Sequence, residues 1–200
     1  IHGGVLLVTT RMNKILGYDL ENFTVTVQPG VLLNTLAEDA SSKGLLYPPD
    51  PGEKFATLGG NVSTNAGGMR AVKYGCTRDY VKAMTVVLPT GEIIKLGSSV
   101  SKTSSGYSLL HLMIGSEGTL GVITELTLKL IPKPLKDVSL ILPFEDIATA
   151  IAAVPHIKLA NLDPQSIEFM ERDIVDSSAA FTGNQVFPTV VNGKEAGAYI

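Results

Sequence analysis

The sequence predicts an α+β fold, with a mostly antiparallel sheet flanked by helices, followed by the beginning of a second strand-and-helix unit. The first observation is a pair of strand-like runs, Tyr80–Leu88 and Glu92–Leu96, which only a tight turn separates, so that an antiparallel hairpin is expected. The second is a helical stripe of apolar residues within Leu32–Lys43. The third is Ile131–Pro134, where two prolines mark a boundary before the pattern of strands and helices starts again.

The first elements are expected to be short strands and a helix. Three runs predict strands: Val5–Val8, Ile15–Tyr18 and Thr24–Gln28. Because Thr24–Gln28 alternates apolar and polar residues, one of its faces is expected to be wet. The helix in Leu32–Lys43 is expected to end at Gly44, a residue that suits the left-handed conformation after a helix.

The middle of the chain is expected to be richer in turns. Gly59 and Gly60 are expected just after the end of a strand, and Asn61–Ala66 could begin a short helix. Beyond the hairpin, Ser98–Ser105 is expected to be a loop and Tyr107–Ile114 a short apolar helix. Val122–Leu130 alternates clearly and predicts the last strand of this part.

The part after the proline boundary is expected to alternate strands and helices. Val138–Leu142 and Ser166–Met170 predict strands, whereas Phe144–Ala153 and Glu171–Ala180 predict helices. Phe181–Pro188 reads as an irregular insertion. A further strand is expected near the end, at Phe187–Val191 or at Ala196–Ile200.

The composition excludes several kinds of protein. A net charge of −3 argues against a nucleic-acid surface and against a polybasic membrane patch. No apolar run is long enough for a membrane span, and no signal peptide is visible. Cys76 is the only cysteine, so an internal disulfide is excluded, and the three histidines have no spacing typical of a metal site. We therefore expect no metal, no nucleic-acid partner and a cytoplasmic location.

The stretch Thr57–Asp79 is the strongest candidate for a binding site. It holds five glycines, two asparagines, a serine and three threonines, with few large apolar residues. Glycine lets backbone N–H groups approach a ligand closely, and a helix N-terminus favours an anion such as a pyrophosphate. The G-x-x-G-x-x-G run Gly115–Gly121 is not a dinucleotide fingerprint, and no P-loop is present.

Four motifs occur in an order and at a spacing typical of one family: YPPDPG (47–52), GGNVSTNAGG (59–68), YGCTRDYV (74–81) and GSEGTLGVITE (115–125). Together they resemble the FAD-linked oxidases of the vanillyl-alcohol oxidase/PCMH superfamily. The branch they resemble most contains glycolate oxidase, D-lactate dehydrogenase and D-2-hydroxyglutarate dehydrogenase. The resemblance extends from about Gly3 to Pro132 and continues more weakly beyond.

The resemblance implies two domains and a flavin reaction. Residues 1–132 would form a PCMH-type FAD-binding domain without its N-terminal pyrophosphate loop, and residues 133–200 would begin a ferredoxin-like cap domain that contributes to the substrate site. The implied reaction oxidises a 2-hydroxy acid, of the glycolate or D-lactate type, to the 2-oxo acid by hydride transfer to the flavin. The electron acceptor stays open.

The resemblance also implies which residues contact FAD. Pro48, Pro49 and Asp50 would line the flavin side of the cofactor, and Glu117, Gly118 and the Gly121–Ile123 backbone would surround its adenine end. The complete set of expected cofactor contacts is Pro48, Pro49, Asp50, Gly59, Gly60, Asn61, Ser63, Asn65, Gly67, Gly68, Gly75, Thr77, Asp79, Glu117, Gly118, Gly121, Val122 and Ile123.

Parts of the family pattern lie outside this sequence. The glycine-rich pyrophosphate loop would precede Ile1, and the histidine and acidic cluster of the substrate site would follow Ile200, so no catalytic residue is named. Residues 1–200 alone are therefore expected to bind FAD weakly and to be inactive. Cys76 is expected to be a buried thiol rather than a covalent flavin attachment, and Ser108 stands where relatives often carry Asp.

Alternatives stay open at this stage. The full protein could be another flavoenzyme of the superfamily, such as an alkyl-dihydroxyacetone-phosphate synthase or a sugar-nucleotide reductase. It could also be a non-catalytic FAD-binding component of an oxidase complex. An exposed sheet edge in the incomplete second domain could pair with another copy to form a homodimer, and a position at the inner membrane face is compatible with the composition.

Overall fold

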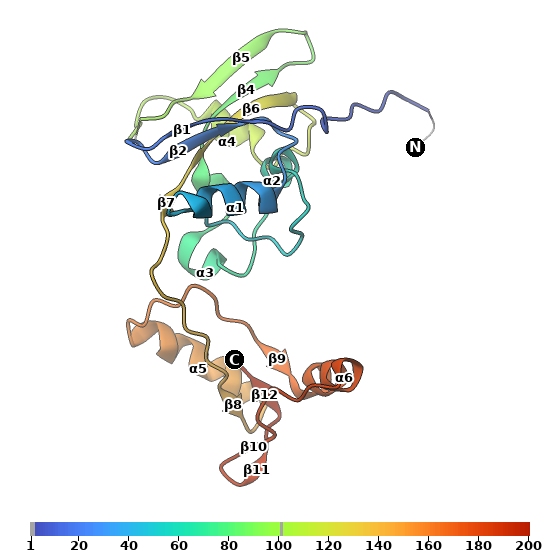
Figure 1. Ribbon diagram of the computed structural model, residues 1–200, viewed down its shortest axis with the longest axis vertical. Coiled ribbons are helices and arrows are strands. Elements are labelled where there is room, and N and C mark those ends of the chain that lie inside the picture. The colour runs from blue at the N-terminus through green and yellow to red at the C-terminus, as the bar shows by residue number, and fades with distance from the viewer. Residues whose placement is uncertain (1–2, 101) are drawn as a thin grey trace. The chain divides into compact units, whose positions relative to one another are not determined.

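The chain folds into two compact units, Ile1–Pro134 and Leu135–Ile200. The computed structural model describes residues 3–100 and 102–200. Each unit is described by itself below (Figure 1).

The first unit is built on a five-stranded antiparallel sheet in the order β1-β2-β6-β4-β5. Its strands are β1 (Ile15–Asp19), β2 (Thr24–Val27), β4 (Val81–Val87), β5 (Ile93–Gly97) and β6 (Val122–Lys129). The hairpin of β4 and β5 and the α+β class predicted from the sequence are both confirmed. A small second sheet pairs β3 (Leu45–Leu46) with β7 (Ile131–Pro132).

Short helices complete the first unit. They are α1 (Leu33–Ser42), α2 (Leu58–Thr64), α3 (Ala71–Tyr74), the 3₁₀ helix η1 (Thr77–Tyr80) and α4 (Leu109–Met113). Figure 1 shows α1 lying along one side of the sheet. Helix α1 buries Leu33, Leu36 and Ala40, which share one helical face, and it ends before Gly44 at φ +71°.

The core of this unit lies between the sheet and the helices. Val25, Leu126 and Leu128 of the sheet and Leu36 and Leu58 of the helices have no exposed surface. All five belong to one contiguous cluster of buried apolar side chains. Burial of this apolar area between the sheet and the helices stabilises the unit.

One expectation about the first strands is wrong, and another holds only in part. Val5–Val8 is no strand, and Val5 and Leu6 are 99% and 87% exposed, because no strand pairs with this run among residues 3–100 and 102–200. The expected wet face of Thr24–Gln28 is covered in part, since Thr24 is buried and the Thr26 hydroxyl lies 3.4 Å from that of Thr127 on the neighbouring strand.

The expected strand end before Gly59 and Gly60 is also wrong. Helix α2 begins at Leu58, three residues before the expected start at Asn61, so both glycines lie in its first turn. Its start is fixed by Thr57, whose Oγ1 accepts a hydrogen bond of 3.1 Å from the Gly60 N–H. A threonine N-cap is a strong local signal, and it outweighs the low helix propensity of the two glycines.

The second unit has a three-stranded sheet, a hairpin and two helices. Strand β12 (Ala198–Tyr199) lies between β8 (Pro143–Phe144) and β9 (Met170–Glu171), and β10 (Val190–Val191) pairs with β11 (Lys194–Glu195). The helices are α5 (Ile147–Leu159) and α6 (Arg172–Thr182).

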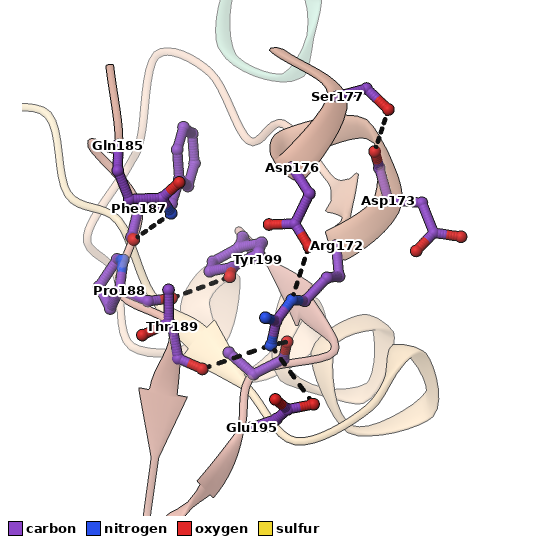
Figure 2. A network of polar contacts seen from close by, with 11 residues as sticks. Arg172, Asp173, Asp176, Ser177, Gln185, Phe187, Pro188, Thr189, Glu195 and Tyr199 are labelled. Atoms are coloured by element: carbon purple, nitrogen blue, oxygen red, sulfur yellow. Dashed lines mark hydrogen bonds and ion pairs between the residues drawn. The ribbon is translucent and has the colours of Figure 1, made fainter. Parts of the chain in front are cut away.

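Arg172, the first residue of α6, connects this helix to the segments that follow it (Figure 2). Its Nε donates to Asp176 Oδ2 at 3.0 Å, and its Nη1 donates to the Ala196 carbonyl at 3.2 Å. The Tyr199 hydroxyl donates to the Pro188 carbonyl at 2.8 Å. Polar contacts therefore supplement the small apolar cluster of Val175, Ala196 and Tyr199.

Some expected elements of the second unit are shorter or absent. Val138–Leu142 is no strand; Val138 and Leu140 are 82% and 71% exposed. The strand expected at Ser166–Met170 is reduced to Met170–Glu171. Helix α5 begins three residues later than Phe144, because Asp146 caps it, and it continues through Pro155. Within the described residues, no helix has both the length and the apolar character needed to cross a membrane.

Candidate functional site

Helix α2 places the centre of the glycine-rich stretch directly on a neighbouring loop. The Gly59 N–H donates to the Pro29 carbonyl at 2.8 Å. A Cβ at Gly59 would lie 2.6 Å from the Pro29 Cβ, so only glycine lets the helix approach this closely.

The end of α2 is joined to the segment around η1. Asn65 adopts the left-handed conformation at φ 49°, which ends the helix, and its Oδ1 accepts a hydrogen bond of 2.9 Å from the Arg78 N–H. The Ala66 carbonyl accepts hydrogen bonds from both the backbone N–H and the hydroxyl of Thr77. Thr77 is wholly buried, so its side chain supports the stretch from inside.

Gly75 and Asp79 shape the turn that leads into η1. Gly75 has φ +79°, and a Cβ there would overlap the Asp79 carboxylate. Asp79 Oδ2 accepts a hydrogen bond of 2.8 Å from the Cys76 N–H. The Asp79 side chain therefore stabilises this turn, and the half-buried thiol of Cys76 lies within it.

The second glycine segment lies on the C-terminal end of α2. The Gly115 N–H donates to the Val62 carbonyl at 3.0 Å, and the Glu117 N–H donates to the Ser63 carbonyl at 2.9 Å. Glu117 and Gly118 both have positive φ, at 52° and 75°. The fold thus brings together two motifs that lie about 50 residues apart in the sequence.

The residues that follow this segment belong to the sheet. Val122 and Ile123 pair with Val87 and Val86 of β4. Gly121 packs against the same strand, since a Cβ there would lie 2.6 Å from Val86 Cγ1. The backbone at Gly121–Ile123 is accordingly fixed by the core.

The proline-rich segment meets the central stretch at Gly68. A Cβ at Gly68 would overlap the Asp50 carbonyl oxygen, so the two backbones touch. The Asp50 carboxylate, 10% exposed, is paired with Lys54 and lies 3.4 Å from Arg70 Nε. Asp50 therefore joins segments of the chain through its side chain. The roles of Lys54 and Arg70 were not expected, because no spacing in the sequence relates Arg70 to Asp50.

Few polar groups of this region are left open for a ligand. Most N–H groups of the stretch are occupied within helices and turns. Within residues 3–100 and 102–200, no hydrogen bond from the Gly67 or Gly68 N–H is found. In the same part of the chain, the buried Asn61 Nδ2 and the Tyr47 hydroxyl, which lies next to Thr77, have no partner within hydrogen-bond geometry.

The open groups differ in accessibility, since Gly67 and Gly68 are exposed whereas Asn61 Nδ2 and the Tyr47 hydroxyl are enclosed by protein atoms. A buried amide without a partner costs stability, so it points to a bound group that accepts its hydrogen bond. Burial raises the pKa of the Tyr47 phenol above its ordinary value, so the group stays neutral and can donate a hydrogen bond. Among the described residues, the N–H groups without a backbone partner include those of Gly67 and Gly68, and both glycines are exposed.

The structure gathers the expected contacts into three groups. The groups are the proline segment with Gly67 and Gly68; α2 with the η1 turn and Glu117–Gly118; and the start of β6 at Gly121–Ile123. Among the described residues, no cluster of three or more His, Cys, Asp or Glu side chains could hold a metal ion.

Known proteins with similar sequences include FAD-linked enzymes. Residues 1–97 match the model of an FAD binding domain. The chain is 68% identical over 200 residues to a D-lactate dehydrogenase of Anaerostipes hadrus, covering 100% of this chain and 42% of that protein. It is 46% identical over 171 residues to glycolate oxidase subunit GlcD of Bacillus subtilis (strain 168), covering 85% and 36%.

Solved structures agree with this similarity. A structure of alkyldihydroxyacetonephosphate synthase has a TM-score of 0.74 at 25% identity, covering 95% of this chain and 37% of the other. The chain thus spans about two fifths of the length of the curated relatives it matches. The matches in sequence and in fold agree with the four motifs: residues 1–97 match an FAD binding domain, and the chain is similar in sequence and in fold to FAD-linked oxidoreductases.

Proposed function

We propose that the full-length protein oxidises a 2-hydroxy acid, of the D-lactate or glycolate type, to the 2-oxo acid. The observation that carries this proposal is the 68% identity to a D-lactate dehydrogenase, because it extends over the whole chain. The 46% identity to a glycolate oxidase component supports the same class of substrate. Bound FAD supplies the hydride acceptor for this chemistry.

In this proposal, the residues of the chain bind and orient the cofactor. The open N–H groups of Gly67 and Gly68 suit phosphate oxygens, and the buried Asn61 amide and Tyr47 hydroxyl donate hydrogen bonds. Pro48 and Pro49 have no backbone N–H and form a stiff wall suited to a flat ring. The other expected contacts act chiefly by holding these groups in place.

The two units have different roles in this proposal. Residues 1–132 form the FAD-binding domain, and residues 133–200 begin the substrate domain. The chain forms two compact units that meet in sequence between Pro134 and Leu135, close to this boundary, which supports the assignment. A cytoplasmic location, with or without attachment to the inner membrane face, and assembly as a homodimer or with other oxidase components belong to the same proposal.

The test is turnover by the full-length protein with a panel of D-lactate, L-lactate, glycolate and D-2-hydroxyglutarate, followed by reduction of a dye. We expect a flavin absorbance band at about 450 nm and the highest kcat/KM with D-lactate or glycolate. Bound FAD without turnover of any acid would instead identify a non-catalytic FAD-binding component. Purified protein that neither contains nor takes up FAD would overturn the proposal at its first step.

A second candidate is an enzyme of the alkyldihydroxyacetonephosphate synthase type. The TM-score of 0.74 to such a structure favours it, but the identity there is 25%, against 68% for the D-lactate dehydrogenase. Formation of alkyldihydroxyacetonephosphate by the full-length protein, without oxidation of any 2-hydroxy acid, would support this candidate.

A further inference from the structure

Two segments of the proposed flavin site meet at one place through two independent contacts. The first contact is between backbones: the Asp50 carbonyl oxygen occupies the space that a side chain at Gly68 would need. The second contact is electrostatic, between Arg70 Nε and Asp50 Oδ2 at 3.4 Å. The proline wall and the open amides are therefore held together at both ends of the Gly68–Arg70 segment.

The Asp50 carboxylate is the buried member of this cluster. Its side chain is 10% exposed, compared with 33% for Arg70 and 50% for Lys54. A carboxylate removed from water to this extent needs cationic partners. With two cations around one carboxylate, the three side chains have a formal charge of +1, and the Asp50 backbone lies against Gly68.

The two cations are not equivalent. Lys54 is four residues from Asp50 and stabilises the proline segment locally. Arg70 follows the glycine pair and precedes α3, so its ion pair connects two segments that are about 20 residues apart. Of the two cations, the guanidinium is therefore the one that links the segments, alongside the backbone contact at Gly68.

We propose that Arg70 is a positioning residue of the flavin site, which acts through Asp50 to hold the Pro48–Asp50 wall at a fixed distance from the Gly67 and Gly68 amides. The inference rests on the proposed binding of FAD and adds a residue outside the expected contacts. A flavin nucleotide that touches both segments binds tightly only when both are held in the geometry that it needs.

The test compares FAD affinity of the full-length apoprotein in Arg70→Met, Arg70→Lys and Lys54→Met variants. Titration is followed by quenching of FAD fluorescence, and the thermal stability of each apoprotein is measured alongside. We expect Arg70→Met to raise the Kd for FAD about tenfold or more, since small misplacements of binding groups have large effects. Arg70→Lys retains the charge and is expected to restore most of the affinity. Lys54→Met, the matched control, should stay within about threefold of wild type.

Asp50→Asn and the Asp50→Asn/Arg70→Met double variant separate positioning from a general loss of structure. If Arg70 acts through Asp50, the Kd of the double variant for FAD is no higher than that of whichever single variant binds FAD less tightly. The visible circular dichroism of its bound flavin is then altered in the same way as in the single variants. An Arg70→Met Kd within twofold of wild type, or effects of the two changes that simply add, overturns the inference. If Arg70→Met does not fold, the Asp50→Asn and Arg70→Lys affinities decide. Failure of the wild type to bind FAD would sink the proposed function instead and would be seen first.

Discussion

Neighbouring glycines in the central stretch are required to different degrees. A Cβ at Gly68 would overlap the Asp50 carbonyl oxygen, whereas a Cβ at Gly67 would meet the Cys76 Sγ at 3.7 Å, an ordinary contact. We expect Gly68→Ala to destabilise the full-length protein by about 1–3 kcal/mol through overpacking and to lower its FAD content.

Gly67→Ala is the matched control and should change the stability by less than about 0.5 kcal/mol. Urea denaturation gives both free energies of unfolding, and the ratio of flavin to protein absorbance gives the FAD content. Equal losses in the two variants would show that the contact between Gly68 and Asp50 does not shape the site.

Thr77 illustrates a predicted contact whose side chain serves the fold. It is wholly buried, and its hydroxyl donates to the Ala66 carbonyl at 2.7 Å. We expect Thr77→Val, which keeps the shape and removes the donor, to lower the free energy of unfolding by about 1 kcal/mol. Thr77→Ser keeps the hydroxyl and is the control for it, although it also removes a methyl group. Denaturation in urea distinguishes them, and a Thr77→Val variant as stable as wild type would contradict this role.

Sequence reasoning identified the glycine pairs because glycine is informative wherever backbones approach closely. It could not identify Arg70, since an ion pair between segments follows from the fold and not from a spacing. It also could not distinguish Gly67 from Gly68, because the Asp50 carbonyl that makes the difference comes from another segment. Residue type thus predicted a candidate site, and tertiary contacts decide what each residue does in the fold.

At the scale of elements, a run of apolar residues predicted a strand correctly in some places and wrongly in others. The hairpin of β4 and β5 formed as expected because a tight turn supplies the partner. Val5–Val8 and Val138–Leu142 are just as apolar, but neither forms a strand. A short strand is stabilised by its neighbours, so periodicity alone could not settle these two runs.

The start of α5 offers a test of how pH affects a single element. Asp146 Oδ1 accepts hydrogen bonds from the Thr149 N–H at 2.7 Å and from the Thr149 hydroxyl at 2.9 Å. The Thr149 backbone N–H, and next its hydroxyl, hold the pKa of the Asp146 carboxyl below its ordinary value. Because the folded pKa is lowered, the stabilisation is complete above the unfolded pKa of about 3.9 and is lost as the pH falls through the folded pKa.

We therefore expect the protection of the Thr149 amide from hydrogen exchange to fall below about pH 4 in the wild type. Asp146→Asn keeps a capping oxygen that does not titrate, so its protection should depend less on pH. Hydrogen exchange of the Thr149 amide is measured in both proteins at each pH, with exchange times adjusted for the pH dependence of the intrinsic exchange rate. The same acid-induced loss in both proteins would assign it to another group.

At the scale of the whole molecule, the segment that begins at Leu135, where the second unit starts, is highly exposed. Leu135 is 101% exposed and Val138 is 82% exposed, and Lys136 between them is also exposed. A protease needs about this kind of accessible, extended backbone to cut a folded chain. Trypsin at a low ratio to the full-length protein should therefore cleave early after Lys136, while the Lys133–Pro134 bond resists because proline follows the lysine.

Mass spectrometry of the first products identifies the cleavage site, and Lys136→Gln is the control that should delay cleavage there. The bonds after Lys82 in β4 and Lys129 in β6 should stay uncut, because both strands are paired within the five-stranded sheet. If the first cuts fell within β4 or β6 instead, the first unit would not be the stable body that a cofactor site needs. FAD that stays with the separated N-terminal product after cleavage at Lys136 would show that the flavin is held by the part of the chain before this connection.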